Sequence, residues 1–353
     1  MKKIIIRQGF PLILSKFRIQ SCARLASTMP KQKVFLTRSD YPKNGVSLLE
    51  PRYELSFWDH EKNGVITKEG MVANVKGVNA IFCCLNDKID KDVIEAAGDS
   101  LKIVSTMSVG VDHVDREILK KKNVKLGYTP DVLTEATAEL TVALLLATSR
   151  RLLEANKLIR EGHWTSPWAP VWMCGPALKG STVGIVGFGR IGQSTAIKLK
   201  AFDVGKILYG SEKEKPEGIE MGACRASLDV LLKESDFVIA TCALSEKTKG
   251  LFSKENFEKM KPTSIFINTS RGGVVDQEAL IDALKNGKIR AAGLDVMTPE
   301  PLPADHPLLC LDNCVILPHI GSATYQTRMV MSDLVAKNII AALEGKEMPA
   351  EYK

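Results

Sequence analysis

The stretch STVGIVGFGRIGQSTAIKLKAF, residues 181–202, constrains the possible folds of this chain more than any other. An apolar, strand-like run (TVGIV) leads directly into a G-x-G-x-x-G pattern, which an amphipathic, helix-like segment follows. In this setting the glycines allow a tight turn and a close approach of the backbone to a pyrophosphate, whose charge the helix N-terminus favours. A tight strand-to-helix turn without a ligand is the alternative. We expect a nucleotide-binding βα unit with cofactor contacts from Gly187, Gly189, Arg190, Ile191 and Gly192.

The same alternation of short apolar runs and amphipathic stretches continues on both sides of this turn. KVFLT, AIFCCL and KIVSTMS precede it, and KILYG, DFVIATCAL, SIFINTS, AAGLDV and CVILP follow it. Strands of this kind separated by helices are typical of parallel sheets built from βα units. We therefore expect an α/β fold with two such series. One long helix over residues 134–162 is expected between them, and an amphipathic helix over residues 324–345 is expected at the end.

A segment rich in tryptophan and proline, HWTSPWAPVWMCGP at residues 163–176, interrupts this alternation. Trp164, Trp168 and Trp172 recur every four residues, as on one face of a helix. The intervening prolines exclude that helix because each removes a backbone donor and clashes with the preceding turn. The segment predicts a surface excursion that is available to a ligand or to a partner subunit.

The net charge of +7 is concentrated at the N-terminus. Residues 1–33 carry eight Lys and Arg and no acidic residue, so the remainder has a formal charge of −1. This near-neutral body gives no support for nucleic-acid binding, and no apolar run approaches the ~18–20 residues of a membrane span. The basic residues 1–32 predict a mitochondrial presequence, or otherwise a disordered tail on an intracellular, cytoplasmic protein.

The eight cysteines contain no C-x-x-C pair, and several lie in apolar runs. This usage favours reduced, buried thiols of an intracellular protein over a disulfide framework. Two histidines and two cysteines between His306 and His319 come nearest to a metal-binding pattern. Their spacing is not a common zinc pattern, and Pro307 and Pro318 break any helix that could align them. We expect no metal site.

Three further polar stretches follow expected strands: INTSRGGVVD, GLDVMTPEPLP and LPHIGSAT. The carboxyl ends of strands in a doubly wound sheet gather beside the nucleotide crevice, so Arg271, Glu300 and His319 should meet there. An Arg can hold a carboxylate and polarise a carbonyl, a His can donate a proton at neutral pH, and a Glu can orient the imidazole. Together they suit hydride transfer to a small 2-keto acid. Taken singly, a surface ion pair, a cap before Pro301 and a satisfied buried histidine are equally good interpretations.

The strand KILYG should end where a nicotinamide dinucleotide places its adenosine ribose. No carboxylate stands at its end to bind the ribose hydroxyls of NAD(H). Ser211, Lys213 and Lys215 would instead suit the 2′-phosphate of NADP(H). Glu212 could repel that phosphate or bind a ribose. NADP(H) is the favoured cofactor, and NAD(H) remains possible.

The motifs GFGRIG, SRG followed by VVD, GLDV-x-x-PEP and PHIGSAT resemble the signatures of the D-isomer-specific 2-hydroxyacid dehydrogenase family. The resemblance covers the chain from about Lys33 to its end. It implies two Rossmann-like domains, with an NAD(P)-binding domain (residues 132–318) inserted into a substrate-binding domain (residues 33–131 plus 319–353). It also implies that Arg271 binds substrate and that His319, paired with Glu300, is the acid/base.

Within the family, STMSVGVDHVD and GYTPDVLTEATAEL are most similar to the animal branch that reduces glyoxylate and hydroxypyruvate. That similarity implies a homodimer in which a loop Trp, here Trp168, reaches the partner's site. Two departures stand out: Glu212 replaces the arginine of NADPH-using relatives, and Pro167 is inserted in the Trp-rich loop. The resemblance further implies substrate contacts from Val109, Gly110 and Ser322, and contacts at the cofactor from Ala243, Thr269, Asp295 and Gly321.

The expected function is therefore NAD(P)H-dependent reduction of hydroxypyruvate and glyoxylate to D-glycerate and glycolate. Another D-2-hydroxyacid dehydrogenase, such as phosphoglycerate dehydrogenase, is one alternative, although no regulatory domain follows the last expected helix. A nucleotide-sensing corepressor of the same fold is the other. The near-neutral body and the short flanking segments make it the less favoured one.

Overall fold

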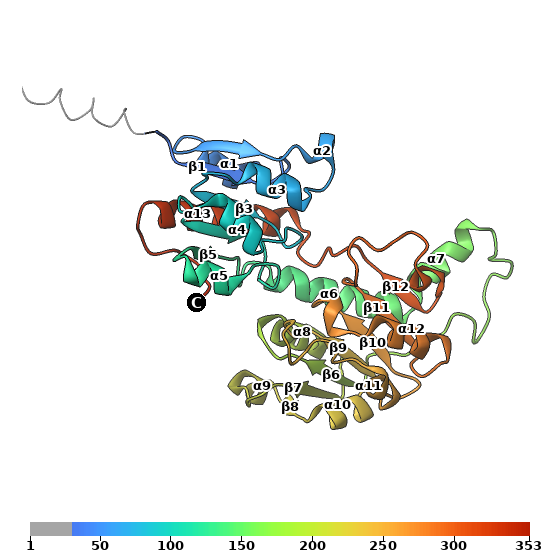
Figure 1. Cartoon of the computed structure of the whole chain (residues 1–353). Helices are drawn as coiled ribbons and strands as arrows, with labels where there is room; N and C mark the ends of the chain where they lie inside the picture. The colour runs from blue at the N-terminus through green and yellow to red at the C-terminus, as the bar shows by residue number, and fades with distance from the viewer. Residues whose placement is uncertain (1–29) are drawn as a thin grey trace, which may run out of the picture.

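The computed structural model describes residues 30–353, and these form two α/β units, each built on a parallel sheet (Figure 1). The predicted presequence-like segment lies almost entirely outside the described residues. No helix within residues 30–353 has the length and apolarity to cross a membrane. The predicted α/β class with two parallel sheets is confirmed.

The first sheet has five strands in the order β2-β1-β3-β4-β5. Its inner strands are buried almost throughout, which explains why they read as continuous apolar runs. The strands are β1 (Lys33–Leu36), β2 (Glu54–Phe57), β3 (Ala80–Cys83), β4 (Ile103–Thr106) and β5 (Lys125–Gly127). The helices are α1 (Lys43–Leu49), α2 (His60–Asn63), α3 (Lys68–Asn74), α4 (Lys91–Ala97) and α5 (Arg116–Lys121).

The last helix, α13 (Tyr325–Leu343), returns to this first sheet, although the whole second sheet precedes it in the chain (Figure 1). Met331, Val335 and Ile339 of α13 share one apolar core with the strands of the first sheet. The helix crosses α1 so closely that a Cβ on Gly45 would overlap the backbone of Ser332. The second unit is thus inserted between two parts of the first, while the exact boundaries at 131/132 and 318/319 stay a prediction.

The second sheet has seven strands in the order β12-β11-β10-β9-β6-β7-β8, all parallel. The strand order reverses between β6 and β9, and ligands of such sheets bind at this kind of switch point. The strands are β6 (Thr182–Val186), β7 (Lys206–Gly210), β8 (Cys224–Arg225), β9 (Phe237–Ala240), β10 (Ile265–Asn268), β11 (Ala291–Leu294) and β12 (Cys314–Ile316). The helical elements are α8 (Arg190–Lys200), α9 (Pro216–Glu220), α10 (Leu228–Glu234), α11 (Lys254–Glu258), α12 (Gln277–Lys285), η2 (Gly272–Val274) and η3 (Pro307–Cys310).

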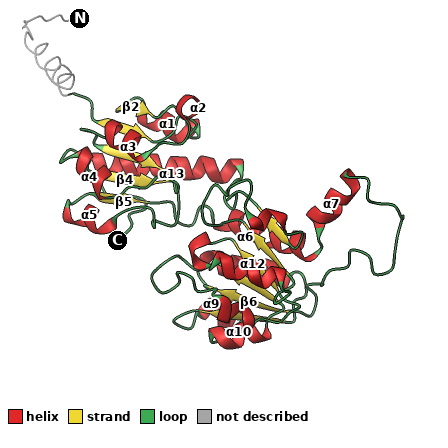
Figure 2. Ribbon diagram, turned by 45° about the vertical axis from the view of Figure 1, so that its right-hand side comes forward, coloured by secondary structure: helices red, strands yellow, loops and turns green. Residues whose placement is uncertain are grey.

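The single long helix expected over residues 134–162 is wrong, because the chain forms α6 (Thr134–Ser149) and α7 (Leu152–Arg160) instead. Arg151 lies between them with a left-handed φ of 53°. The physical reason is that residues 175–176 pack against the end of α6. A Cβ on Gly175 would overlap the Ser149 carbonyl, and the Ser149 hydroxyl donates to the Pro176 carbonyl at 2.5 Å. This packing ends α6, and α7 with the Trp-rich loop projects from the molecule (Figure 2).

Candidate active site

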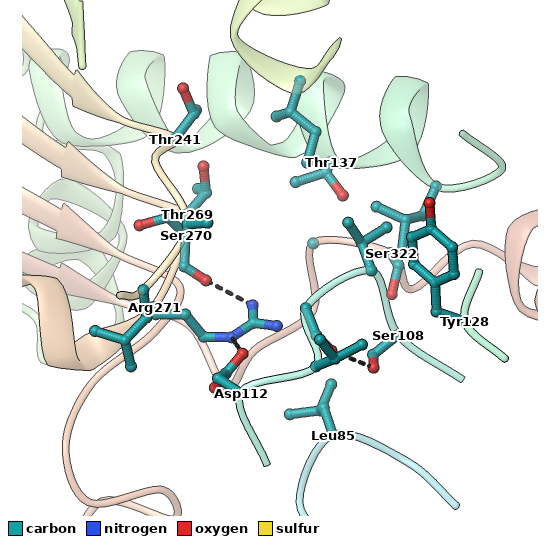
Figure 3. Close-up of a pocket in the computed structure, with 18 of the residues that line it drawn as sticks. Leu85, Ser108, Asp112, Tyr128, Thr137, Thr241, Thr269, Ser270, Arg271 and Ser322 are labelled. Carbon is teal, nitrogen blue, oxygen red and sulfur yellow. Dashed lines mark hydrogen bonds and ion pairs between the residues drawn. The ribbon is translucent and has the colours of Figure 1, made fainter. Parts of the chain in front are cut away.

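A cavity of about 500 Å³ lies between the carboxyl ends of the two sheets and is lined by both units. Figure 3 shows loops of the first unit facing strand ends of the second across this cavity, with α6 running along one side. Ten of the residues predicted to contact substrate or cofactor line it: Val109, Gly110, Ile191, Ala243, Thr269, Arg271, Asp295, His319, Gly321 and Ser322.

Glycine is required at the three positions of the strand-to-helix turn for different structural reasons. Gly187 has a φ of 95°, and a Cβ there would lie 2.5 Å from the Cys242 backbone. A Cβ on Gly192 would overlap the Gly187 carbonyl. A Cβ on Gly189, in contrast, would meet no atom of the described residues within 4 Å, and Gly189 stands at the N-cap of α8 without a side-chain cap. The open space and uncapped amides suit a pyrophosphate that approaches the backbone here.

Arg190, next in the turn, forms an ion pair with Asp131 of the first unit. Asp131 has a φ of 68° at the junction between β5 and α6. Both side chains are about two-thirds exposed, at 62% and 63%, so the pair contributes at most about 1 kcal/mol to stability. Because this ion pair is weak, the guanidinium of Arg190 can exchange Asp131 for a ligand anion at the predicted nucleotide turn.

The loop after β7 carries the three residues predicted to bind a 2′-phosphate. The Ser211 hydroxyl donates to the Lys213 carbonyl, and the amide of Lys215 donates to the Tyr209 hydroxyl at 3.1 Å. None of these residues lines the main cavity, which ends short of this loop. The structure places them at the end of β7, beside the switch point of the second sheet.

Two further cations reach the same loop, and sequence reasoning missed both. Lys247 Nζ lies 2.8 Å from Glu212 Oε1, and this hydrogen bond holds the pKa of the Glu212 carboxyl below its usual value. Arg225 donates to the Ser211 and Glu212 carbonyls at 3.1 and 2.8 Å. Because these cations come from β8 and from the loop after β9, no local pattern in the sequence could have connected them with Glu212.

His319 lies at the turn that leaves the second sheet, in a left-handed conformation with a φ of 54°. Its amide donates to the Asp295 carbonyl at 2.9 Å. The Asp295 carboxylate, 1% exposed, accepts from the amides of Ile320 and Gly321 at 2.8 Å each. Burial raises the pKa of Asp295, and the two amide bonds and the charge of His319 oppose that rise. Asp295 lines the cavity, but its carboxylate holds this turn.

Glu300 does not line the cavity, but it binds the predicted proton donor. Its Oε2 lies 2.7 Å from Nδ1 of His319, and its Oε1 accepts from the Met297 amide at 3.0 Å. Burial raises the pKa of the Glu300 carboxyl, but the bond to His319, the Met297 amide and the nearby Arg271 together bring it below its usual value. Glu300 is therefore an anion at neutral pH, and its carboxylate fixes the orientation of the imidazole through Nδ1.

Arg271 follows β10 and extends toward the first unit (Figure 3). Its Nε donates to Asp112 Oδ1 at 3.1 Å, and its Nη1 donates to the Ser270 carbonyl at 2.8 Å. A Cβ on Gly110 would overlap Nη2 of Arg271, so the glycine lets the guanidinium rest against the loop backbone. Sequence reasoning missed Asp112, although it stands in the same SVGVD stretch as Gly110.

Trp168, predicted to contact substrate, lies on the projecting loop and is 76% exposed. It does not line the cavity of its own chain. Trp164 on the same loop is also exposed. The two tryptophans therefore remain available only to another molecule or another subunit.

The cysteines are free thiols over the described part of the chain, but the expectation that they are buried is wrong for Cys174, Cys224 and Cys310, which are exposed. Within residues 30–353 no three His, Cys, Asp or Glu side chains are placed to hold a metal ion. His306 instead contacts Gln277 at 3.1 Å and accepts from the Leu308 amide.

The geometry can be set beside known proteins. Residues 142–321 match the model of the D-isomer specific 2-hydroxyacid dehydrogenase, NAD binding domain. Human glyoxylate reductase/hydroxypyruvate reductase is 50% identical over 323 residues, which are 91% of this chain and 98% of the human protein. Glyoxylate reductase of Pyrococcus furiosus is 43% identical, covering 90% and 94% of the two chains.

Solved structures agree with these relatives. A protein of Thermus thermophilus superposes with a TM-score of 0.84 at 40% identity, covering 91% of this chain and all of the other. The NADPH-dependent glyoxylate/hydroxypyruvate reductase of Sinorhizobium meliloti, solved with NADP and malonate, has a TM-score of 0.79 at 30% identity, covering 91% and 97%. The similarity thus extends over both units and not only over the nucleotide turn.

The open space at Gly189 leads to a prediction about cofactor binding. Gly189→Ala should weaken binding of NADPH and NADH at least about tenfold, because the added methyl occupies the space left for the pyrophosphate. Titration of protein fluorescence with each dinucleotide measures this. The melting temperature of the same variant should stay at the wild-type value, since the methyl meets no described atom. A large loss of stability with unchanged dinucleotide affinity would contradict this interpretation of Gly189.

Proposed function

The chain belongs to the D-isomer specific 2-hydroxyacid dehydrogenase family, and we propose that it reduces glyoxylate and hydroxypyruvate to glycolate and D-glycerate. The predicted family is confirmed, and membership makes the chain an NAD(P)-dependent oxidoreductase. The human and archaeal relatives named for glyoxylate reduction support the substrate. One observation carries the proposal: His319, which is bonded to Glu300 behind it, and Arg271 face one cavity beside the nucleotide turn, and the three residues follow three different strands.

His319 is the proposed general acid. Its Nδ1 is engaged by the Glu300 carboxylate at 2.7 Å, which leaves Nε2 to deliver a proton to the oxygen of the keto group. The anionic Glu300 orients the ring through its bond to Nδ1. Asp295 fixes the backbone of the turn that carries His319, while Glu300 fixes its ring.

Arg271 and the loop at Val109 and Gly110 are the proposed clamp for the substrate carboxylate. The guanidinium offers planar donors that match a carboxylate, and the backbone amides of the loop can add two more. Gly110 brings the two parts together, because its missing side chain lets Arg271 lie against the loop. Asp112 orients the guanidinium through Nε and leaves Nη2 on the side of Gly110. The clamp would hold the keto carbon in one orientation relative to His319.

The nicotinamide cofactor, when bound, supplies the hydride. The turn at Gly187 to Gly192 would hold its pyrophosphate, and Ser322 with Gly321 would close the cavity over the reacting end. NADP(H) is the proposed preference. Ser211, Lys213 and Lys215 support it, and Arg225 with Lys247 adds two cations at the same loop. Lys247 also pairs with Glu212 and so offsets the repulsion between this carboxylate and a 2′-phosphate.

A homodimer is a further part of the proposal. The projecting arm is defined as α7 and the loop through Trp172. It exposes several large apolar side chains together, and such a grouping marks an interaction site, whereas single exposed apolar residues are normal. Trp168 and Val171 are 76% and 84% exposed, and Leu152, Leu153 and Ile159 on α7 are about half exposed. A second copy would cover this surface and receive Trp168 near its own substrate cavity.

The substrate and cofactor can be tested by steady-state kinetics. The wild-type chain should reduce glyoxylate and hydroxypyruvate, but not phosphohydroxypyruvate, with a higher kcat/KM for NADPH than for NADH. A marked NADH preference would contradict the proposed role of the cations around Ser211. No turnover of any keto acid, with either dinucleotide bound, would contradict the proposed function and favour a nucleotide-sensing role.

The proton donor can be tested separately. His319→Gln should lower kcat for hydroxypyruvate by ~10²–10⁴, because the developing alkoxide loses its acid. NADPH affinity should be unchanged, since the turn at Gly189 is untouched. His60→Gln is the matched control. His60 contacts Ser39 and Asp40 of the first unit and does not line the cavity, so this variant should retain the wild-type rate. Equal rates for His319→Gln and the control would remove His319 from this role.

The dimer can be tested by sedimentation. The wild-type chain should sediment at twice the 38.7 kDa of one copy. Leu153→Glu combined with Ile159→Glu should produce monomers, because two charges would be buried in the interface. Val65→Glu, at an apolar position that is 69% exposed on the first unit, is the control and should stay dimeric. A wild-type monomer, or dissociation by the control alone, would contradict the proposal.

A further inference from the structure

Three polar side chains next to the loop at Val109 and Gly110 have no part in the chemistry described so far. Thr106, at the end of β4, lies 2.9 Å from the Ser108 hydroxyl and 3.0 Å from Nε2 of His113. Ser108 in turn donates to the Gly110 carbonyl at 2.7 Å, a bond visible in Figure 3. Thr106 and Ser108 are 0% and 3% exposed. A continuous chain of hydrogen bonds therefore connects His113 with the Gly110 carbonyl.

The direction of every bond in this chain follows from proton counting. Each hydroxyl has a single proton, and that of Ser108 is committed to the Gly110 carbonyl. Ser108 must then accept a hydrogen bond from Thr106, and this bond uses the single hydroxyl proton of Thr106. Thr106 must in turn accept from His113, so Nε2 of His113 carries a proton. The carbonyl at one end thus sets the tautomer of the imidazole at the other.

The surroundings of His113 agree with this assignment. Its Nδ1 is buried and has no hydrogen-bond partner among the described residues, so a proton there would have no acceptor. Burial is the main cause that lowers the pKa of His113 to about 4; the charge of Asp112 opposes this shift and the charge of Arg271 adds to it. At neutral pH the ring is uncharged, with its single ring proton on Nε2.

The hydrogen-bond chain ends at Gly110, where the loop backbone contacts the guanidinium of Arg271. The Ser108 carbonyl accepts from the Thr129 amide at 2.9 Å, so the start of the loop is fixed to the segment that follows β5. The Ser108 hydroxyl then fixes the Gly110 carbonyl, two residues along, and closes the loop into a tight turn. Since Nη2 of Arg271 rests against Gly110, a displaced loop would also displace the guanidinium.

We propose that Thr106, Ser108 and His113 are positioning residues that hold the carboxylate clamp of the substrate in place through a directed hydrogen-bond chain. The inference rests on the proposed function, because it assumes that the loop at Val109 and Gly110 binds a keto acid. Ser108 lines the cavity, but none of the three has a proposed role at the reacting atoms. The hydrogen-bond chain sets the orientation of the loop backbone against Arg271. It therefore determines the affinity for the substrate carboxylate rather than the rate of hydride transfer.

Thr106→Val tests the relay, because valine keeps the shape and removes the link. KM for hydroxypyruvate should rise about five- to tenfold, while kcat and KM for NADPH change less than about twofold. Thr106→Ser restores the hydroxyl and should restore KM. Thr148→Val is the matched control: it removes an equally buried hydroxyl, which donates to the Leu144 carbonyl within α6 and does not line the cavity, so its loss should leave KM unchanged. Equal shifts in the two valine variants, or no rescue by serine, would overturn the proposal.

A second measurement depends neither on turnover nor on the valine variants. Long-range ¹H–¹⁵N NMR of the full wild-type chain shows which ring nitrogen of His113 carries the proton, with His113→Asn used only for assignment. The proton should be on Nε2. A proton on Nδ1 would overturn the relay even if the kinetics fit. If the wild type reduced no keto acid but His113 had the expected tautomer, the proposed function would fail while the hydrogen-bond chain itself would stand.

Discussion

The buried carboxylate of Asp295 holds the chain at the point where it leaves the second sheet, and much of the molecule depends on that hold. Two amide donors converge on it, at Ile320 and Gly321, and such charge-assisted bonds are stronger than neutral ones. They keep His319 in a left-handed conformation that a residue with a side chain rarely adopts. The same turn directs the imidazole to Glu300 and sends the chain back to the first sheet through α13.

Two ion pairs connect the two units where the ligands are proposed to bind. Arg271 pairs with Asp112, and Arg190 pairs with Asp131, so in both cases a cation of the second unit meets an acid of the first. Partly exposed pairs of this kind contribute little to stability. The fold rests instead on apolar cores on both sides of each sheet. Exchange of an aspartate for a ligand anion would therefore cost the fold little.

Sequence reasoning succeeded where the signal is local. The buried parallel strands read as apolar runs, and the glycine turn combines a strand, a spacing and a helix within one short stretch. It failed where the cause is distant in the chain. The break at Arg151 comes from the packing of Gly175, and no breaker residue marks it. The strand Glu54–Phe57 was missed because this edge strand is largely exposed and has no apolar run.

The sequence by itself determined the two series of parallel strands, the nucleotide turn and the three residue types suited to reducing a keto acid, because periodicity and motif spacing are local properties. Only the tertiary structure decided which side chains meet. Arg271 and Asp112 are 159 residues apart, and Lys247 reaches Glu212 from 35 residues away. The tautomer of His113 depends on a hydrogen-bond chain that closes only when β4 and its loop are folded. Such pairings depend on strand order and chain crossing, which no local pattern records.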